Sequence, residues 1–397
     1  MPRTVSQTGL ESSNSSDQPL VYLDHAAATK VHAAIIDKHA DLSRQFYFNP
    51  HSTHQYSENC LRAIQQAKEQ LLGMLGIGRD EAEVIWTSGG TEANNLGILG
   101  CLRELRGTAT VAVESTAHSS VLAPARAYTD EGGKYTEIPV NKRGKLDLEA
   151  LSSNGGMPPG VLALCHVNNE TGAHQDLASI RNWLDSNGQD TYLVVDALQS
   201  FTKLEIDWHT AEIDMLALGG RKIGGPPHTG ALVMRRGTPL KPIMFGGGQQ
   251  KGYRPGTMDT VGIIEFVKAA EYSIQKRDQK LEQVRNVRDY LLTALCDGEF
   301  GEPRVLSPAD ASPYILNIAL PGYEGAIIMR ALAEKNIILS TGSACSAEST
   351  STSHVLEAMQ IDRRTARSAL RISFSAETNT VDIDHFLTGL KTVLHEY

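Results

Sequence analysis

Short apolar runs that alternate with helical patterns constrain the fold of this chain more than any other feature. The runs are VIWT at 84–87, TVAV at 110–113, VLALC at 161–165, YLVVD at 192–196, DMLAL at 214–218 and GALVM at 230–234. Strands that are apolar on both faces and alternate with helices predict a mainly parallel sheet with helices on both sides. Ligands of such sheets bind beyond the carboxyl ends of the strands, so polar residues after these runs are the first candidates for a site.

A second region of the 397-residue chain has its own strand and helix patterns. A long helical pattern from Ile263 to about Cys296 leads to strand candidates at 314–320 and 370–374 and to helices near 324–335 and 382–396. This pattern predicts a smaller α/β domain behind a connecting helix. We therefore expect a flexible, Ser-rich tail over 1–20, a large domain over 21–262 and a small domain over 263–397.

Charge and cysteine usage narrow the class of protein. The net charge of -9 leaves no basic surface for direct nucleic-acid binding. No segment has the length of apolar sequence that a membrane span needs, and the N-terminus lacks the apolar core of a signal peptide. The five cysteines form no CxxC pair, so neither a zinc site nor a disulfide framework is indicated, and we expect reduced thiols in the cytoplasm.

A glycine-rich turn directly follows the run at 84–87. Ser88, Gly89, Gly90 and Thr91 open a predicted helix in SGGTEANNLGILG. Free backbone N–H groups and the positive end of a helix dipole bind phosphate, and glycine lets the backbone approach it closely. Alone, such a turn is as often ordinary loop geometry. The segment has neither the Walker spacing nor GxGxxG, which argues against a nucleotide.

Two further strand ends carry residues with cofactor chemistry. Asp196, the last residue of YLVVD, can pair with a protonated pyridine nitrogen or can equally cap the next segment. Lys222 lies among glycines in GGRKIGGPPHTG and can form a Schiff base, although an isolated lysine is usually a surface residue. The order of phosphate loop, His118 as a ring-stacking candidate, Asp196 and Lys222, each beside a predicted strand end, favours a pyridoxal 5'-phosphate (PLP) site.

Cys345 differs from the other four cysteines in its surroundings. It lies in STGSACSAESTSTS at 341–353, which is too small and too polar for a core. A thiol in such a loop is exposed and can move to a bound substrate, as a nucleophile must. Four cysteines are expected to be inert packing, one in a strand and three in helical patterns: Cys165, Cys60, Cys101 and Cys296.

From about Val21 to the C-terminus the chain resembles the cysteine desulfurases, a branch of the class V aminotransferase group of PLP enzymes. The resemblance rests on YLDHAAAT, NPHSTH, TSGGTEANN, HVNNETG, VVDALQS, RKIGGP, FGGGQQ, YRPGT, TGSACS and LRISF, in this order. PIMF and FGGGQQKGYRPGT are similar to the desulfurases of DNA phosphorothioation and to selenocysteine lyases. The resemblance implies the α/β PLP-dependent transferase fold type I, with a mainly parallel seven-stranded sheet in the large domain.

The same resemblance implies a set of cofactor contacts. His118 would stack on the pyridine ring and act in catalysis, Asp196 would pair with the ring nitrogen, and Gln199 would bond the ring hydroxyl. Gly90 and Thr91 would hold the phosphate.

Further implied roles concern the reaction and the assembly. Lys222 would bind the cofactor covalently, Cys345 would attack the substrate sulfur, and Thr257 would reach the phosphate from the other subunit of a homodimer. The implied substrate-binding residues are Asn169, Arg371 and Ala27.

The chain departs from the family pattern beside the lysine. The family usually has Ser-x-His-Lys, whereas this chain has Gly219, Gly220 and Arg221 before Lys222. A hydroxyl donor to the phosphate is therefore lost, and Arg221 can itself clamp the phosphate with two hydrogen bonds. Ala28 stands where a Thr is common.

The expected function is conversion of L-cysteine to L-alanine, with transfer of sulfur to Cys345 as a persulfide for an acceptor protein. Iron–sulfur cluster assembly, tRNA thiolation and DNA phosphorothioation are all compatible destinations. One alternative is a selenocysteine lyase or another PLP-dependent β-lyase. The other is a catalytically degenerate scaffold for sulfur-transfer partners, which Gly219 and Arg221 motivate.

Overall fold

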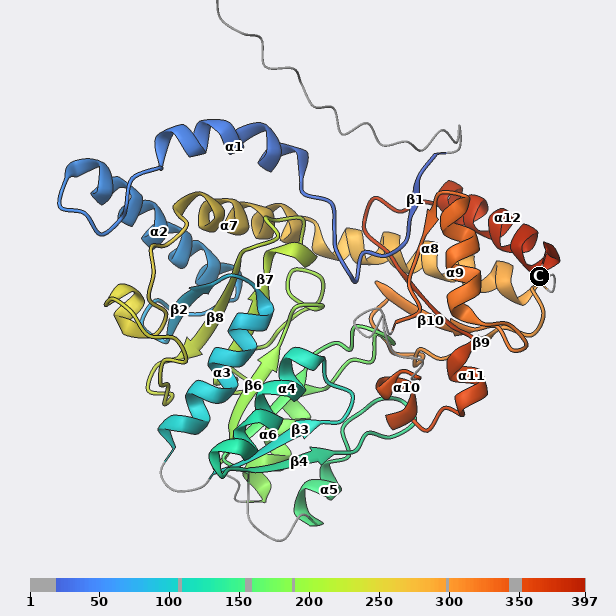
Figure 1. The fold of residues 1–397 in the computed structure, drawn as a ribbon, viewed down its shortest axis with the longest axis horizontal. Coiled ribbons are helices and arrows are strands. Elements are labelled where there is room, and N and C mark those ends of the chain that lie inside the picture. The colour runs from blue at the N-terminus through green and yellow to red at the C-terminus, as the bar shows by residue number, and fades with distance from the viewer. Residues whose placement is uncertain are drawn as a thin grey trace, which may run out of the picture.

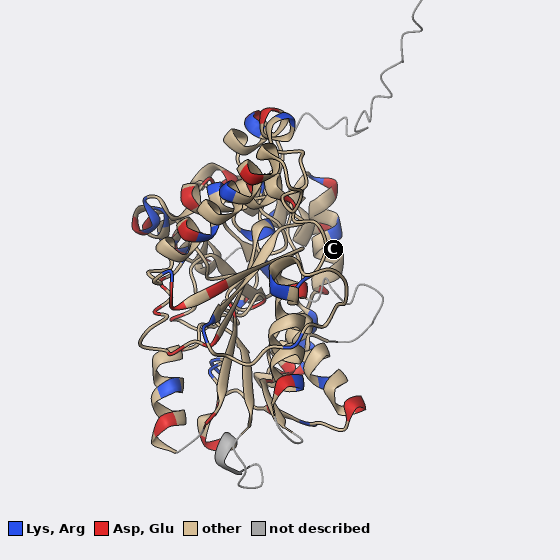
Figure 2. Cartoon of the chain, turned by 90° about the vertical axis from the view of Figure 1, so that its left-hand side faces the viewer, with Lys and Arg blue, Asp and Glu red and all other residues tan. Residues whose placement is uncertain are grey.

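The computed structural model describes residues 19–105, 109–153, 159–187, 190–297, 300–342 and 352–396. Figure 1 shows a large α/β region around one sheet and a smaller region around the C-terminal helices. Most of the length of the strands carries neither acidic nor basic residues, which lie mainly on helices and loops (Figure 2). No helix in these ranges is long and apolar enough to cross a membrane.

A seven-stranded sheet forms the centre of the large region. Strand β8 is antiparallel to both of its neighbours, and the pairs formed by β3, β4, β5, β6 and β7 are parallel. The mainly parallel sheet expected from the apolar runs is therefore confirmed. In spatial order the strands are β2 (Ala82–Thr87), β8 (Gly230–Arg235), β7 (Met215–Gly219), β6 (Tyr192–Asp196), β5 (Val161–Cys165), β3 (Thr110–Glu114) and β4 (Lys134–Ile138).

Helices cover both faces of this sheet. The core on one face joins the strands to α2 (Gln55–Met74), α6 (Leu177–Ser186) and α7 (Thr260–Ile274), and the core on the other joins them to α3 (Gly90–Glu104) and α4 (Ser119–Ala127). The carboxylates of Asp176 and Asp259 cap α6 and α7. The remaining elements here are α1 (Ala33–Gln45), α5 (Leu148–Ser153) and the 3-10 turns η1 (Tyr128–Glu131), η2 (Gly220–Lys222) and η3 (Gln249–Gly252).

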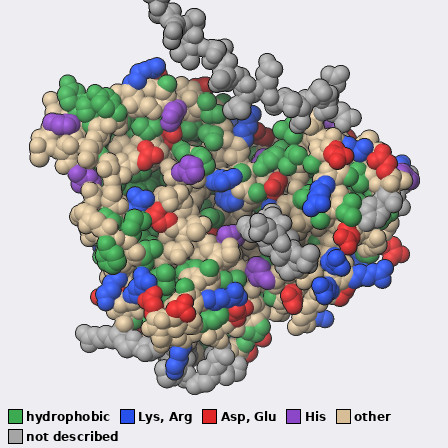
Figure 3. All heavy atoms as spheres, in the orientation of Figure 1, with side chains coloured by type: hydrophobic (Ala, Val, Ile, Leu, Met, Phe, Trp, Pro, Cys, Tyr) green, Lys and Arg blue, Asp and Glu red, His purple; other side chains and the backbone are tan. Residues whose placement is uncertain are grey.

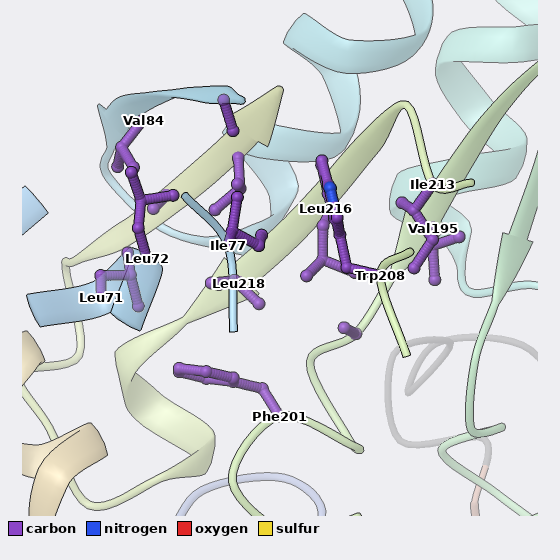
Figure 4. Close-up of a cluster of buried hydrophobic side chains, with 14 of the residues drawn as sticks. Leu71, Leu72, Ile77, Val84, Val195, Phe201, Trp208, Ile213, Leu216 and Leu218 are labelled. Carbon is purple, nitrogen blue, oxygen red and sulfur yellow. The ribbon is translucent and has the colours of Figure 1, made fainter. Parts of the chain in front are cut away.

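Large apolar side chains fill the space between the sheet and the first of these helix layers. Figure 4 shows Leu71 and Leu72 of α2 near Leu218 of β7, with Trp208 beside Leu216 and Phe201 below them. Trp208 and Phe201 are 1% and 2% exposed. The close packing of these side chains holds the sheet and the adjacent helices in place, and with them the strand ends that carry the site.

The smaller region has its own core and two short sheets. One is the antiparallel sheet of β9 (Arg304–Val305), β10 (Ile315–Ala319) and β12 (Ala369–Ser373), and the other pairs β1 (Val21–Tyr22) with β11 (Ile337–Ile338) in parallel. The helices of this region among the described residues are α8 (Arg277–Cys296), α9 (Gly325–Glu334), α10 (His354–Ala358), α11 (Arg363–Arg367) and α12 (Thr380–Glu396).

The N-terminal segment joins the two regions. Val21 and Leu23 lie in the core of the smaller region, although the expected boundary put them in the large domain. Further along, the backbone N–H of Thr29 donates to Arg221 O at 2.9 Å and that of His32 to Gly224 O at 3.0 Å. Residues 21–32 therefore run from one region to the other across the turn that holds the lysine.

Three expectations differ from the structure in detail. The helical pattern at 263–296 is two helices, because Lys276 between α7 and α8 has a left-handed backbone (φ 55°). Strand β4 was not expected, because its sequence KYTEI is mostly polar at the sheet edge. Cys296 is exposed, so its assignment to packing is wrong, whereas Cys60, Cys101 and Cys165 are buried as predicted.

Candidate active site

A cavity of about 350 Å³ lies at the carboxyl ends of β5, β6 and β7. Cys165, Asp196 and Gly219, the last residues of these three strands, all line it. Because parallel strands end at the same edge of a sheet, segments far apart in the sequence converge here. The expected site residues that line the cavity are Ala27, Gly90, Thr91, His118, Asn169, Asp196, Gln199, Arg221, Lys222 and Arg371.

The first turn of α3 forms one end of the cavity. Gly89 has a φ of 148°, which favours glycine, and a Cβ on Gly90 would lie 2.2 Å from Leu198 Cδ2. The backbone of this turn is therefore open to an anion at the positive end of a 15-residue helix.

Glu92 braces this turn from outside. Its carboxylate accepts hydrogen bonds from Ser88 N at 2.7 Å and from Arg254 Nε at 2.8 Å. Burial alone would raise the pKa of Glu92, but these hydrogen bonds bring it below the usual value. The carboxylate is thus ionised and paired, so it does not oppose an anion at the helix start.

Asp196 lies buried at the end of β6. Its Oδ2 accepts from Asn94 Nδ2 at 2.7 Å and its Oδ1 from Leu198 N at 2.9 Å. Burial raises the pKa of Asp196 despite these two donors, so the carboxylate lacks charge compensation. A cationic ring nitrogen would supply that compensation.

Gln199 and His118 flank the same part of the cavity. The Gln199 amide donates to Ala26 O at 2.9 Å, and its Oε1 is buried without a hydrogen-bond partner among the described residues. His118 is fixed by Ser120, whose Oγ lies 2.8 Å from Nδ1 and whose N–H donates to that nitrogen at 3.1 Å. Burial lowers the pKa of His118, so the ring is neutral and suited to stack on a flat apolar face.

Lys222 follows β7 in the turn η2. Its Nζ donates to Ala26 O at 2.8 Å and to Ala27 O at 2.5 Å. Burial, together with Arg371 and Arg221, lowers the pKa of Lys222 to about 8. The fraction of neutral amine near neutral pH is therefore far larger than for a surface lysine, as attack on an aldehyde requires.

Arg371 closes the cavity from the smaller region. Its side chain is 4% exposed and lies 2.7 Å from Asp24 Oδ1 through NH2, and its NH1 donates to Asn169 O at 3.0 Å. Its Nε is buried without a hydrogen-bond partner in the described part of the chain. A guanidinium held in this way can still accept a small carboxylate from the cavity.

Two expected site residues are not placed in this cavity. Cys345 lies outside the described residues. Thr257 is not among the lining residues, and its expected role is toward the cavity of a second subunit.

Three residues around the cavity were missed at the level of sequence, although each lies in a quoted motif. Asn94 and Glu92 belong to TSGGTEANN, and Asp24 belongs to YLDHAAAT. The signal for Asn94 was its place one helical turn after Gly90, on the same side of the helix.

The residues present fit PLP. A Cβ-free cradle at Gly90, an uncompensated carboxylate on Asp196 and an orphaned amide oxygen on Gln199 match a phosphate, a ring nitrogen and a ring hydroxyl. The fold and the site therefore define a PLP-dependent enzyme of fold type I.

Comparison with known proteins agrees with this class. The family model of aminotransferase class V matches residues 21–386. A cysteine desulfurase of Bradyrhizobium diazoefficiens is 32% identical over 381 residues, covering 96% of this chain and 96% of the relative. The chain belongs to the cysteine desulfurases within the class-V aminotransferase family.

Two solved structures give the same result. A NifS-like protein superposes with a TM-score of 0.87 at 26% identity, covering 96% of this chain and 100% of that one. DndA from Streptomyces lividans has a TM-score of 0.72 at 31% identity, covering 89% and 99%. Cysteine desulfurases are PLP-dependent and take sulfur from L-cysteine, and these relatives do not favour the β-lyase or scaffold alternatives.

Proposed function

We propose that this cavity binds PLP through Lys222 and desulfurates L-cysteine, with Cys345 receiving the sulfur as a persulfide. The observation that carries the proposal is the convergence of Lys222, Asp196 and Arg371 with the start of α3 in one cavity of about 350 Å³. Such a cavity can hold a phosphorylated ring and one small amino acid.

Each side chain has a task that follows from its surroundings. The cofactor, when bound, supplies an electron sink that stabilises negative charge at the substrate α-carbon. Asp196 would keep the ring nitrogen protonated, and the Lys222 amine would bind the aldehyde and later move the α-proton. Arg371 and Asn169 would orient the substrate carboxylate, and Ala27 would lie against the substrate.

Arg221 replaces the family histidine at the phosphate end. It lines the cavity beside Lys222, and its guanidinium is exposed. We assign it a bidentate contact to the cofactor phosphate, which offsets the hydroxyl lost at Gly219.

Cysteine treatment followed by mass spectrometry of the peptide around Cys345 tests the assignment. We expect a sulfur adduct on this peptide in the wild-type chain and none after Cys345→Ala. Cys345→Ala is also expected to keep the yellow cofactor while losing sulfide release, whereas Lys222→Ala loses the absorbance of lysine-bound PLP.

Cys296 offers a control because it is an exposed cysteine outside the predicted acceptor loop. Cys296→Ala is expected to desulfurate cysteine like the wild type. Undiminished sulfide release by the Cys345→Ala variant would reject the assignment of the acceptor thiol.

A homodimer is part of the proposal. Exposed aromatic side chains support it: Tyr47 is 72%, Tyr56 60% and Phe245 86% exposed. Figure 3 shows hydrophobic side chains gathered at the upper left, over the segment that joins α1 and α2. Apolar surface of this kind usually marks an interface.

Subunit mixing tests the predicted role of Thr257 across that interface. A hybrid of one Lys222→Ala subunit and one Thr257→Val subunit would contain one complete site, because each chain supplies what the other lacks. We expect activity to return on mixing. If both variants are inactive alone and a verified hybrid dimer of the two is also inactive, Thr257 does not act in the cofactor site of the other subunit.

The persulfide would pass to a sulfur-acceptor protein. A cytoplasmic location suits this step, because a reducing compartment keeps the acceptor thiol free of disulfides.

A further inference from the structure

A second cavity of about 160 Å³ shares Lys222, alone among the described residues, with the cofactor cavity. Its lining comes from the N-terminal segment, the loop after β6, the turn with Lys222 and Ile223, Ser273 of α7, and the smaller region with α8. The N-terminal segment contributes His25 and Thr29, the loop contributes Thr202 and Lys203, and Tyr314 represents the smaller region.

Positive charge dominates the lining. Four lysines face this space against one carboxylate, and two histidines add further donors. The charged and titratable groups are Lys30, Lys203, Lys222, Lys280, His25, His32, Tyr314 and Glu377. Glu377 and Lys30 are exposed, so the deeper part of the cavity holds cations without a carboxylate.

Lys203 lies half-buried in this lining. No hydrogen bond or ion pair joins its Nζ to another described residue, and the ammonium lies 5.4 Å from the centroid of the Tyr314 ring. Burial, together with Lys222, lowers the pKa of Lys203 to about 7. Thr202 holds the adjacent backbone at a φ of 66°, which is unusual for a β-branched residue.

His25 supplies a second unsatisfied group in the same cavity. The residue is 8% exposed, and its Nδ1 has no hydrogen-bond partner among the described residues. The Tyr22 carbonyl favours a proton on the ring without reaching hydrogen-bond geometry, while burial and Lys203 lower the pKa of His25 to about 4. Lys203 and the His25 ring both line the cavity, so a ligand with acceptor atoms can lie between them.

Lys280, in the same lining, has hydrogen-bond acceptors for its ammonium group. Its Nζ donates to Tyr272 O at 2.7 Å and to Ser273 O at 3.1 Å. No carbonyl among the described residues accepts a hydrogen bond from Lys203 Nζ. The two lysines of this lining therefore differ in their hydrogen-bond partners.

We propose that this cavity is a binding site for a small tetrahedral oxyanion, phosphate or sulfate, held by Lys203 and His25 next to Lys222. Donors reach the cavity from several parts of the chain, and an oxyanion offers them four acceptor oxygens, whereas a carboxylate offers two. The lysines disfavour a ligand that carries an ammonium group. The cavity volume of about 160 Å³ limits the ligand to a small one.

Phosphate binding to the PLP-loaded protein tests the proposal, because loading fills the cofactor's own phosphate site. We expect phosphate and sulfate to raise the melting temperature in a saturable way, and chloride at equal ionic strength to have no such effect. Lys203→Met is expected to weaken binding about ten- to a hundredfold, since one charge-assisted contact is lost. Lys134→Met, at an exposed lysine outside the cavity, is the matched control and should bind phosphate like the wild type.

Three results would overturn the proposal. One is equal phosphate affinity of Lys203→Met and the wild type, and another is binding that disappears when PLP is loaded. The third applies even if Lys203→Met does not fold: a crystal of the unaltered holoenzyme soaked in sulfate that shows no density between Lys203 Nζ and the His25 ring.

Discussion

Gly90→Ala tests how the start of α3 and the loop after β6 together shape the cofactor site. A Cβ at position 90 would lie 2.2 Å from Leu198 Cδ2, and its next neighbours are Leu198 Cδ1 at 2.7 Å and Cγ at 2.8 Å. An ordinary carbon contact is about 3.5 Å, so the leucine must move by about 1.3 Å or more. Leu198 lines the cofactor cavity, so the cavity is the free space into which it can turn.

The cost of this movement falls on the cofactor-bound state. An empty cavity can accept the displaced Leu198, whereas a bound ring competes with it. Overpacking costs about 1–3 kcal/mol, which corresponds to PLP binding about 5- to 150-fold weaker. The better helix propensity of alanine offsets less than about 1 kcal/mol at this terminal position, and it acts on both states.

Titration of the cofactor-free protein with PLP, followed by the absorbance of the lysine-bound form, measures the effect. Leu198→Ala in the same chain removes the colliding carbons, so the double variant should regain most of the lost affinity. Gly97→Ala in the same helix is the control, since its nearest contact is Leu232 Cδ1 at 3.3 Å and it should bind PLP normally. Unchanged PLP affinity of Gly90→Ala, or a loss that Leu198→Ala does not relieve, would refute the steric argument.

Two further predictions concern stability. Trp208→Ala should lower the free energy of unfolding by about 3–5 kcal/mol in denaturant titrations, because the ring is 1% exposed in the core of the large region; Trp208→Phe should lose less, and equal losses would contradict the packing argument. For His166, burial and the nearby charges of His174 and Lys145 lower the pKa to about 3. The unfolded chain, with an ordinary value near 6.5, therefore binds more protons, and the stability that the neutral ring contributes is lost as the pH falls from about 6.5 toward 3. At pH 5 the loss is about 2 kcal/mol relative to neutral pH, so His166→Gln should show a flatter decline in acid, and parallel curves for both chains would disprove the assignment.

The parts of the fold that could be predicted are those whose residues are apolar on both faces. Each central strand is such a run, and Asp196 ends one of them while Lys222 lies in the turn after another. Because the carboxyl ends of parallel strands share one edge, their convergence follows from the strand pattern alone. Strand β4 escaped prediction because an edge strand with one solvated face shows no continuous apolar run.

The contacts that tune the site could not be predicted from the strand pattern. The ion pair of Arg371 with Asp24 joins residues 347 positions apart, and no local pattern encodes it. The hydrogen bond from Asn94 to Asp196 depends on how α3 lies against β6. The break at Lys276 depends on a left-handed residue that is not a glycine, so the sequence carries no punctuation there.

The path of residues 21–32 has a consequence for mechanics and for protein engineering. One end of this strap is a strand of the smaller region, the other is bonded to the turn at 221–224, and between them the carbonyls of Ala26 and Ala27 hold the Lys222 amine. A rotation of one region relative to the other would therefore displace the carbonyls that bind Lys222 Nζ. Deletions that extend past Val21 into this segment would remove part of the lining of the cavity that contains Lys222. Affinity tags therefore belong upstream of Val21.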